Sequence, residues 1–93
     1  MIRRVEFALR ARKDLKKVPH HIVNKLDTWI ESVERSGLEQ VRKLPGYHDE
    51  PLAGRREGQR SVRLNVAWRA IYEILADEEV SLVSIVEVTH HEY

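Results

Sequence analysis

The sequence contains no cysteine among its 93 residues. A chain without thiols forms no disulfide and no thiolate metal site, which suits a reducing compartment. It also has no apolar run near the roughly 18–20 residues that a membrane-spanning helix needs. The first residues, Met1 to Glu6, lack the apolar stretch of a signal peptide. We therefore expect a cytoplasmic protein with no membrane partner.

The charges of the chain are unevenly distributed. A chain of this length predicts one domain, residues 1–93, with a formal net charge of +1. Residues 1–44 hold 11 Lys and Arg against 6 Asp and Glu, whereas residues 77–93 hold none against 5. Such charges often only solvate helices. The asymmetry also fits one surface for a polyanion and a second region kept away from it.

The first half of the chain predicts a strand and two helices. Alternation of apolar and charged residues over 2–7 is typical of a short strand. A basic helix is expected over 10–18, because Pro19 ends it. A long helix follows from Pro19 to Ser36, with a further short helical piece over 38–44. The apolar stripe of the long helix comprises Ile22, Leu26, Trp29, Ile30 and Val33.

The second half predicts a loop and three strands. Residues 47–58 form a polar, glycine-containing connector. Two consecutive strands then meet near Val66 and Ala67, and the most β-prone run of the chain covers 80–88. The order of elements predicts a two-layer α+β fold, in which two N-terminal helices pack on a largely antiparallel four-stranded sheet. The opposite face of that sheet stays partly open.

Candidate site residues gather on this open face. Alternation places Arg63 opposite the apolar set of its strand, and Arg69 lies on the neighbouring strand. An arginine in an apolar strand costs desolvation, so Arg69 either pairs with Glu73 or Glu87 or meets an anionic ligand. Other candidates on this face or at its mouth are Thr89, His91 and Tyr93 from the last strand, and His48, Glu50, Arg55 and Arg56 from the loop.

These residue types meet the requirements for cutting an RNA strand. The 2′-hydroxyl must lose a proton, the phosphate must be neutralised, and the departing 5′-oxygen must gain a proton. Arginine bonds two phosphate oxygens and stays charged. Glu50, His90 and His91 exchange protons, and Tyr93 stacks on a base or orients the phosphate.

The same residues also allow simpler interpretations. The face fits a module that binds nucleic acid or protein without catalysis, with Glu50 beginning a turn at Pro51 and the chain end frayed. No metal or cofactor is expected. His20 and His21 are adjacent on a helix and point apart, with no acid one turn on.

Five segments between Leu44 and the end of the chain form an ordered set of motifs. They are Leu44-Pro-Gly, Glu50-Pro-Leu-Ala-Gly, Gly58 to Asn65, Trp68-Arg-Ala-Ile-Tyr and Val86 to Tyr93. With this set the chain resembles the RelE/ParE superfamily of bacterial toxins, in its RelE/HigB/YoeB branch. The resemblance implies a toxin of a type II toxin–antitoxin pair that cleaves mRNA, commonly in the ribosomal A site. It also implies a cognate antitoxin that silences the toxin.

The resemblance also implies catalytic roles. Arg69 matches the family's arginine that contacts the scissile phosphate, and Arg63 matches a basic position on the preceding strand. Glu50 matches the glutamate proposed as general base in YoeB-type toxins. His91 and Tyr93 resemble the histidine and tyrosine at the end of that type, here separated by one residue.

The chain departs from RelE in its candidate base. RelE has lysines where this chain has Arg63 and either Ser61 or Arg60, so Glu50 or a histidine must accept the proton here. His90 and His91 are both candidates for the acid, and strand parity favours His91. The residues expected to contact RNA are His48, Arg55, Arg56, Arg60 and His90.

Two other functions remain open from the sequence. A ParE-like protein would inhibit DNA gyrase by binding, with no bond cleaved. A toxin homologue that has lost activity would only bind its antitoxin. The ordered ending His91…Tyr93 and Glu50 favour cleavage, because a binder needs no pair of proton-exchanging groups.

Overall fold

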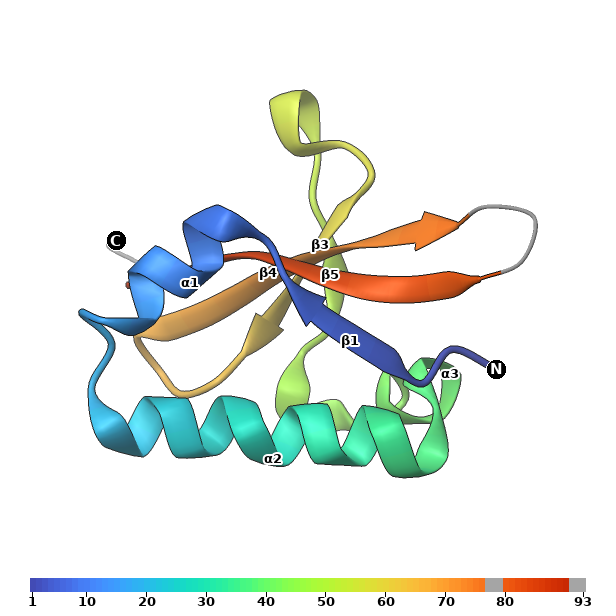
Figure 1. Ribbon diagram of the computed structural model, residues 1–93, viewed down its shortest axis with the longest axis horizontal. Helices are drawn as coiled ribbons and strands as arrows, with labels where there is room; N and C mark the ends of the chain where they lie inside the picture. Colours follow the sequence, from blue (N-terminus) through green and yellow to red (C-terminus); the bar gives the residue numbers. More distant parts are fainter. Residues whose placement is uncertain (77–79, 91–93) are drawn as a thin grey trace.

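The computed structural model describes residues 1–76 and 80–90, which form a five-stranded sheet with helices packed against it (Figure 1). The strand order across the sheet is β1-β5-β4-β3-β2, with β1 parallel to β5 and the other neighbours antiparallel. The helices are α1 (Leu9–Leu15), α2 (His20–Ser36) and α3 (Leu38–Val41). The strands are β1 (Arg4–Phe7), β2 (Glu50–Pro51), β3 (Gln59–Arg63), β4 (Trp68–Ala76) and β5 (Ser81–His90).

Helix α2 runs along one face of the sheet (Figure 1). Its apolar stripe is buried at Ile22, Leu26, Trp29 and Val33, as the helical spacing predicts. The Trp29 ring lies 5.4 Å, centroid to centroid, from the Tyr72 ring on β4. This contact joins the two layers at the centre of the core, and the predicted two-layer α+β fold is confirmed.

Gly37 ends α2 for a steric reason. Its φ of 86° lies in the left-handed region that favours glycine, and its N–H donates to the Val33 carbonyl at 2.8 Å. A Cβ at this position would stand 2.2 Å from Cγ of Met1. The predicted end of the long helix at Ser36 is therefore correct.

The sheet has five strands, whereas four were predicted. The additional strand, β2, lies within the segment assigned to a polar loop, where Glu50 pairs with Ser61 and Pro51 with Arg60. Two residues are too few to show alternation, and proline is tolerated at a sheet edge because its missing N–H can face outward. The same segment contains two short 3-10 turns, η1 (Pro45–Tyr47) and η2 (Gly54–Arg56).

Alternate residues of β3, β4 and β5 point to opposite faces. The inner face, toward α2, carries Val62, Ala70, Tyr72 and Val88, which are at most 4% exposed. Opposite pairs place the other set on what we call the outer face: Glu50, Ser61, Arg63, Arg69, Ile71, Glu87 and Thr89. The register of β4 and β5 shifts between Ile71 and Tyr72, a β-bulge that leaves the Arg69 and Thr89 pairing regular.

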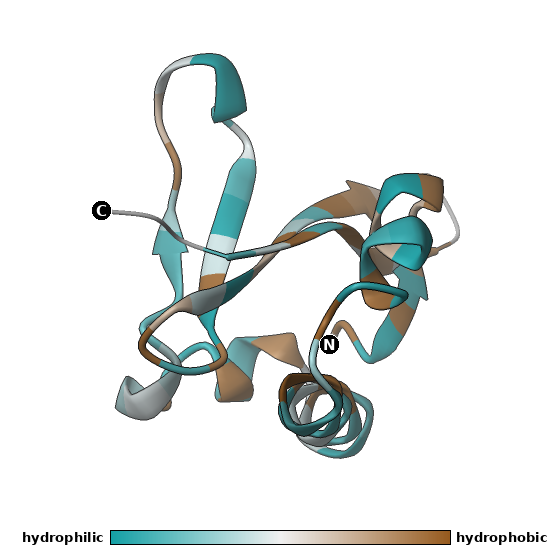
Figure 2. Ribbon diagram, turned by 90° about the vertical axis from the view of Figure 1, so that its left-hand side faces the viewer, coloured by the Kyte–Doolittle hydropathy of each residue, from teal (hydrophilic) through white to brown (hydrophobic). Residues whose placement is uncertain are grey.

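Two elements project beyond the sheet away from α2. The loop that contains η2 rises from the outer face, and its residues are largely hydrophilic, while α2 appears end-on below the sheet (Figure 2). Helix α1 lies beside the second half of β5, where Asp14 Oδ2 accepts the Val88 N–H at 3.0 Å. No helix in the described part of the chain is both long and apolar enough to cross a bilayer.

Candidate nucleic-acid interface

Arg63 and Arg69 lie directly opposite each other on β3 and β4. Both side chains therefore stand on the outer face, as the sequence predicts. Like charges at opposite positions of an antiparallel pair destabilise the sheet. An anion bound between the two guanidinium groups removes that repulsion, and a phosphate accepts from both.

Backbone carbonyls orient the Arg69 guanidinium. Its Nη1 donates to the carbonyl oxygen of Asn65 at 3.0 Å and to that of Trp68 at 3.3 Å. These carbonyls belong to the tight turn between β3 and β4, whose shape is fixed by Asn65. The Asn65 Oδ1 accepts the N–H groups of Ala67 and Trp68, each at 2.8 Å. Arg69 is thus held at the turn end of the outer face.

His48 lies beside Arg63. Its Nε2 is 3.5 Å from Arg63 Nη1, and its backbone adopts the left-handed conformation with φ 45°. A non-glycine residue in this conformation is uncommon and marks a constrained position. The Nε atom of Arg63 is buried and has no hydrogen-bond partner within the residues that the structure describes.

Glu50 stands on the outer face one row away from the two arginines. It is opposite Ser61 on β3, and Ser61 precedes Arg63 by two residues on the same face. Two residues along a strand correspond to about 7 Å. The structure thus brings Glu50, His48, Arg63 and Arg69 to one region.

Asp49 anchors the segment that carries His48 and Glu50. Its carboxylate accepts from Arg60 Nε at 2.5 Å and from the Tyr72 hydroxyl at 2.6 Å, and its side chain is 1% exposed. Burial, followed by the hydrogen bond to Asp49, raises the pKa of Tyr72 above its ordinary value. Burial is the largest single influence on Arg60 and by itself would lower its pKa, but the hydrogen bond to Asp49 and the negative charge of that carboxylate together raise the pKa.

Arg60, predicted as an RNA contact, is therefore placed away from the outer face. It pairs with Pro51 and Tyr72 across the sheet, whereas its neighbours Ser61 and Gln59 point the other way. The anchoring role of Asp49 was not predicted from the sequence. The available signal was an acid two residues after an aromatic residue and eleven before a strand arginine, which is too weak to predict a buried pair.

The predicted contacts Arg55 and Arg56 lie in η2 and are exposed. Arg56 donates to Gln59 Oε1 at 2.9 Å and forms an ion pair with Glu87. Glu87 also accepts from Arg10 of α1 at 3.1 Å. Glu87 therefore links α1 and the η2 loop across the outer face.

The last described residues belong to β5. His90 lies opposite Trp68, and the two rings meet edge to face with centroids 5.2 Å apart. His90 thus has the parity opposite to Thr89 and Arg69. His91 and Tyr93, the predicted acid and stacking residue, lie outside the described residues.

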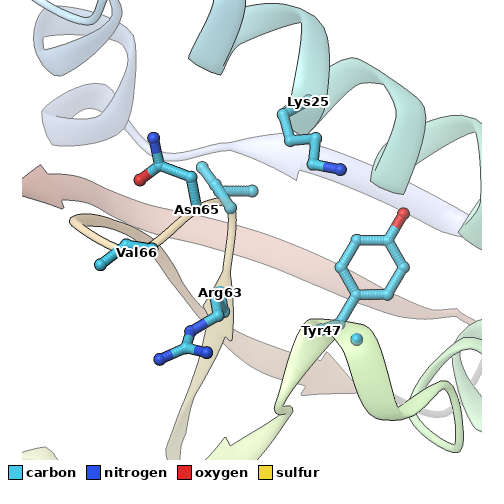
Figure 3. A pocket seen from close by; sticks show the side chains of 7 residues that line it. Lys25, Tyr47, Arg63, Asn65 and Val66 are labelled. Carbon is cyan, nitrogen blue, oxygen red and sulfur yellow. The ribbon is translucent and has the colours of Figure 1, made fainter.

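A pocket of about 440 Å³ opens between α2, η1 and the turn from β3 to β4 (Figure 3). Two cations, Lys25 and Arg63, border it. The remaining lining residues of the pocket are Gly46, Tyr47, Leu64, Asn65 and Val66.

Residues 1–76 and 80–90 contain no group of three His, Asp or Glu side chains arranged to hold a metal ion.

Comparison with solved structures gives the same fold. A YoeB/ParE toxin from Agrobacterium tumefaciens is 18% identical, with a TM-score of 0.69 over 96% of this chain and 99% of that one. YafQ in the DinJ–YafQ toxin–antitoxin complex of Escherichia coli is 26% identical, with a TM-score of 0.72 over 97% of this chain and 94% of that one.

A third similar structure is the RelBE2 toxin–antitoxin complex from Mycobacterium tuberculosis. It is 28% identical, with a TM-score of 0.64 over 95% of this chain and 96% of that one. No curated protein matches the chain at a significant level. A family described as the ParE toxin of the type II toxin–antitoxin system parDE matches residues 5–93. The chain therefore belongs to the ParE toxin family of type II toxin–antitoxin systems, within the RelE/ParE superfamily that its sequence resembles.

Proposed function

We propose that this toxin is an endoribonuclease that cuts mRNA and thereby inhibits translation. The observation that carries the proposal is the opposed pair Arg63 and Arg69 on the outer face, with Glu50 one row away and His48 beside Arg63. Two guanidinium groups neutralise a phosphate, and a carboxylate or imidazole nearby exchanges its protons.

The chemistry divides among these residues. Arg69 and Arg63 hold the scissile phosphate and stabilise the charge that develops on its oxygens. Glu50 or a histidine removes the 2′-hydroxyl proton, and the 2′-oxygen attacks phosphorus. His91 donates a proton to the 5′-oxygen as the P–O bond breaks, and Tyr93 stacks on a base. In this scheme the guanidinium groups supply the charge that a metal supplies in other nucleases.

The partners follow from the same family relation. The solved DinJ–YafQ and RelBE2 structures are toxin–antitoxin complexes, which supports a cognate antitoxin for this chain. The basic helix α1 ends with Arg12 and Lys13 in its last turn and lies beside β5. Such a helix suits rRNA, which supports action on the ribosome, in the cytoplasm.

A second candidate function is inhibition of DNA gyrase by binding alone. The match to the ParE family over residues 5–93 favours it. In that case the arginine pair contacts a protein or DNA surface, and no bond is cut. A toxin homologue that only binds its antitoxin would be harmless when expressed without that partner.

Induction of the toxin in cells without its antitoxin separates these functions. Sequencing of RNA 5′ ends should show new cuts within open reading frames at a fixed codon position, with no DNA damage response. DNA damage without new RNA ends would overturn the proposal in favour of gyrase. Unimpaired growth without either signal would leave only the antitoxin-binding function.

A further inference from the structure

The pocket beside Arg63 carries unbalanced positive charge. Lys25 and Arg63 border it, and no Asp or Glu is among its lining residues. Arg56 and Arg60, by contrast, are each bonded to a carboxylate. A cationic pocket without an acid of its own favours a ligand that presents acceptor atoms or negative charge.

The polar atoms that border the pocket are mainly hydrogen-bond donors. Lys25 can only donate. Asn65 already uses its Oδ1 to accept two backbone N–H groups, so its amide N–H groups are what it offers to a ligand. Arg63 adds a positive charge at the rim, where its side chain turns toward the outer face. A ligand with acceptor atoms matches these groups.

The walls of the pocket suit a flat ring. Tyr47 forms one side, and its hydroxyl points toward the Lys25 amine (Figure 3). Leu64 is buried, whereas Val66 on the turn is 74% exposed and adds apolar surface at the rim of the pocket. Aromatic side chains stack on unpaired bases in proteins that bind single-stranded RNA.

We propose that this pocket binds the nucleobase adjacent to the phosphate held by Arg63 and Arg69. The inference rests on the proposed function and adds a subsite to it. Arg63 borders the pocket while its guanidinium points away from Lys25 and Tyr47 (Figure 3), and its strand position places it on the outer face. An RNA strand that crosses the turn from β3 to β4 therefore has one phosphate at the arginine pair and the next base at Tyr47.

The donors also predict which base binds best. Guanine presents two acceptors, O6 and N7, on one edge, and lysine and arginine commonly contact both. The volume of about 440 Å³ lies within the roughly 300–1,000 Å³ of small-molecule sites. We infer a preference for guanine next to the cut. An acidic side chain of the antitoxin is the rival occupant, but it makes no use of the ring wall.

The test uses the full chain and a short single-stranded RNA in which every 2′-hydroxyl is methylated, so that it cannot be cut. Tyr47→Ala should weaken binding by about 5- to 150-fold, the measured range for loss of one base stack. Tyr47→Phe keeps the ring and should bind nearly as the parent does. Lys25→Gln should weaken binding of a guanine-containing RNA by about 5- to 150-fold, because a donor to O6 and N7 is lost.

Arg35→Gln is the matched control, because Arg35 lies in the last turn of the same helix and does not border the pocket. It should leave affinity for the RNA unchanged. Replacing guanine by adenine in the RNA should weaken binding to the parent but not to Lys25→Gln. Unfolding transitions show whether each variant is folded. If Tyr47→Ala does not fold, RNA binding by Lys25→Gln provides the test, because Lys25 lies on the exposed side of α2.

The outcomes separate the subsite from the cleavage reaction. If the parent cuts RNA while Lys25→Gln and Tyr47→Ala bind the methylated RNA as the parent does, the pocket assignment is wrong and cleavage stands. If the parent does not cut but binding responds to these changes, the subsite stands and cleavage is wrong. Weaker antitoxin binding with unchanged RNA binding would assign the pocket to the antitoxin and overturn the inference.

Discussion

The inner and outer faces of β3, β4 and β5 are built from alternate residues of the same strands, yet the inner face is apolar and buried whereas the outer face carries charged side chains. On the inner face Val62, Ala70 and Tyr72 are buried against α2. On the outer face Arg63 stands opposite Arg69, an arrangement that lowers stability. The buried core uses one parity and the proposed RNA site uses the other, so substitutions on the two faces should have separable effects.

The largest effect on stability is expected at the centre of the inner face. Trp29→Ala removes a fully buried ring that contacts Tyr72, and should lower the free energy of unfolding by about 3–5 kcal/mol. Trp29→Phe should cost far less, because it keeps a ring and removes an N–H without a hydrogen-bond partner among the described residues. Denaturant unfolding measures both, and equal losses would contradict the packing described.

The next largest loss of stability is expected at Asp49, which bonds to Arg60 and Tyr72. Asp49→Asn removes the charge that Arg60 and Tyr72 share, and should lower the free energy of unfolding by about 3 kcal/mol. It should also lower RNA cleavage more than its stability loss explains, because His48 and Glu50 flank it. Glu57→Gln, an acid of the same loop outside this network, serves as the control. A folded Asp49→Asn variant with parental cleavage would show that the anchor does not position the site.

A smaller effect is expected for the acid on the outer face. Glu87→Gln weakens the link between Arg10 and Arg56, two largely exposed arginines, so it should lower the free energy of unfolding by only about 1 kcal/mol. Affinity for RNA at low salt should rise, because a carboxylate is removed from the proposed RNA-binding face. Reduced affinity in a folded variant would mean that Glu87 orients the arginines for RNA.

The smallest effect on stability has the opposite sign. Arg63→Gln removes one of two like charges at opposite positions and should raise the free energy of unfolding by about 0.5 kcal/mol. The same change should lower RNA cleavage, because a phosphate contact is lost. Thermal unfolding and a cleavage assay on one preparation test this trade-off, and a variant that loses stability along with activity would contradict it.

The sequence predicts both faces because alternation is a local property. Val62 and Leu64 fall inside, and Arg63 falls outside, from a period of two alone. Both parities of β4 are covered, since Ala70 and Ile71 are both buried. The parity that joins Arg69 to Thr89 holds because the bulge lies elsewhere in the strand pair.

The remaining features depend on contacts between distant residues. The strand β2 comprises only Glu50–Pro51, and it exists because β3 offers an edge for pairing. The placement of Arg60 depends on Asp49, eleven residues earlier, and on Tyr72 across the sheet. The pocket beside Arg63 requires α2, η1 and a turn to meet. No local pattern encodes contacts between residues that are distant in the sequence, so these features were not predicted.

The central claim is that the guanidinium at position 69 acts on a phosphate of RNA. Its most direct test is the rate of mRNA cutting by purified Arg69→Ala and Arg69→Lys variants on programmed ribosomes, compared with the parent. We predict that Arg69→Ala cuts about 10²- to 10³-fold more slowly, with unchanged antitoxin binding, and that Arg69→Lys recovers only part of the rate. An Arg69→Ala variant that cuts mRNA at the parental rate would contradict the claim.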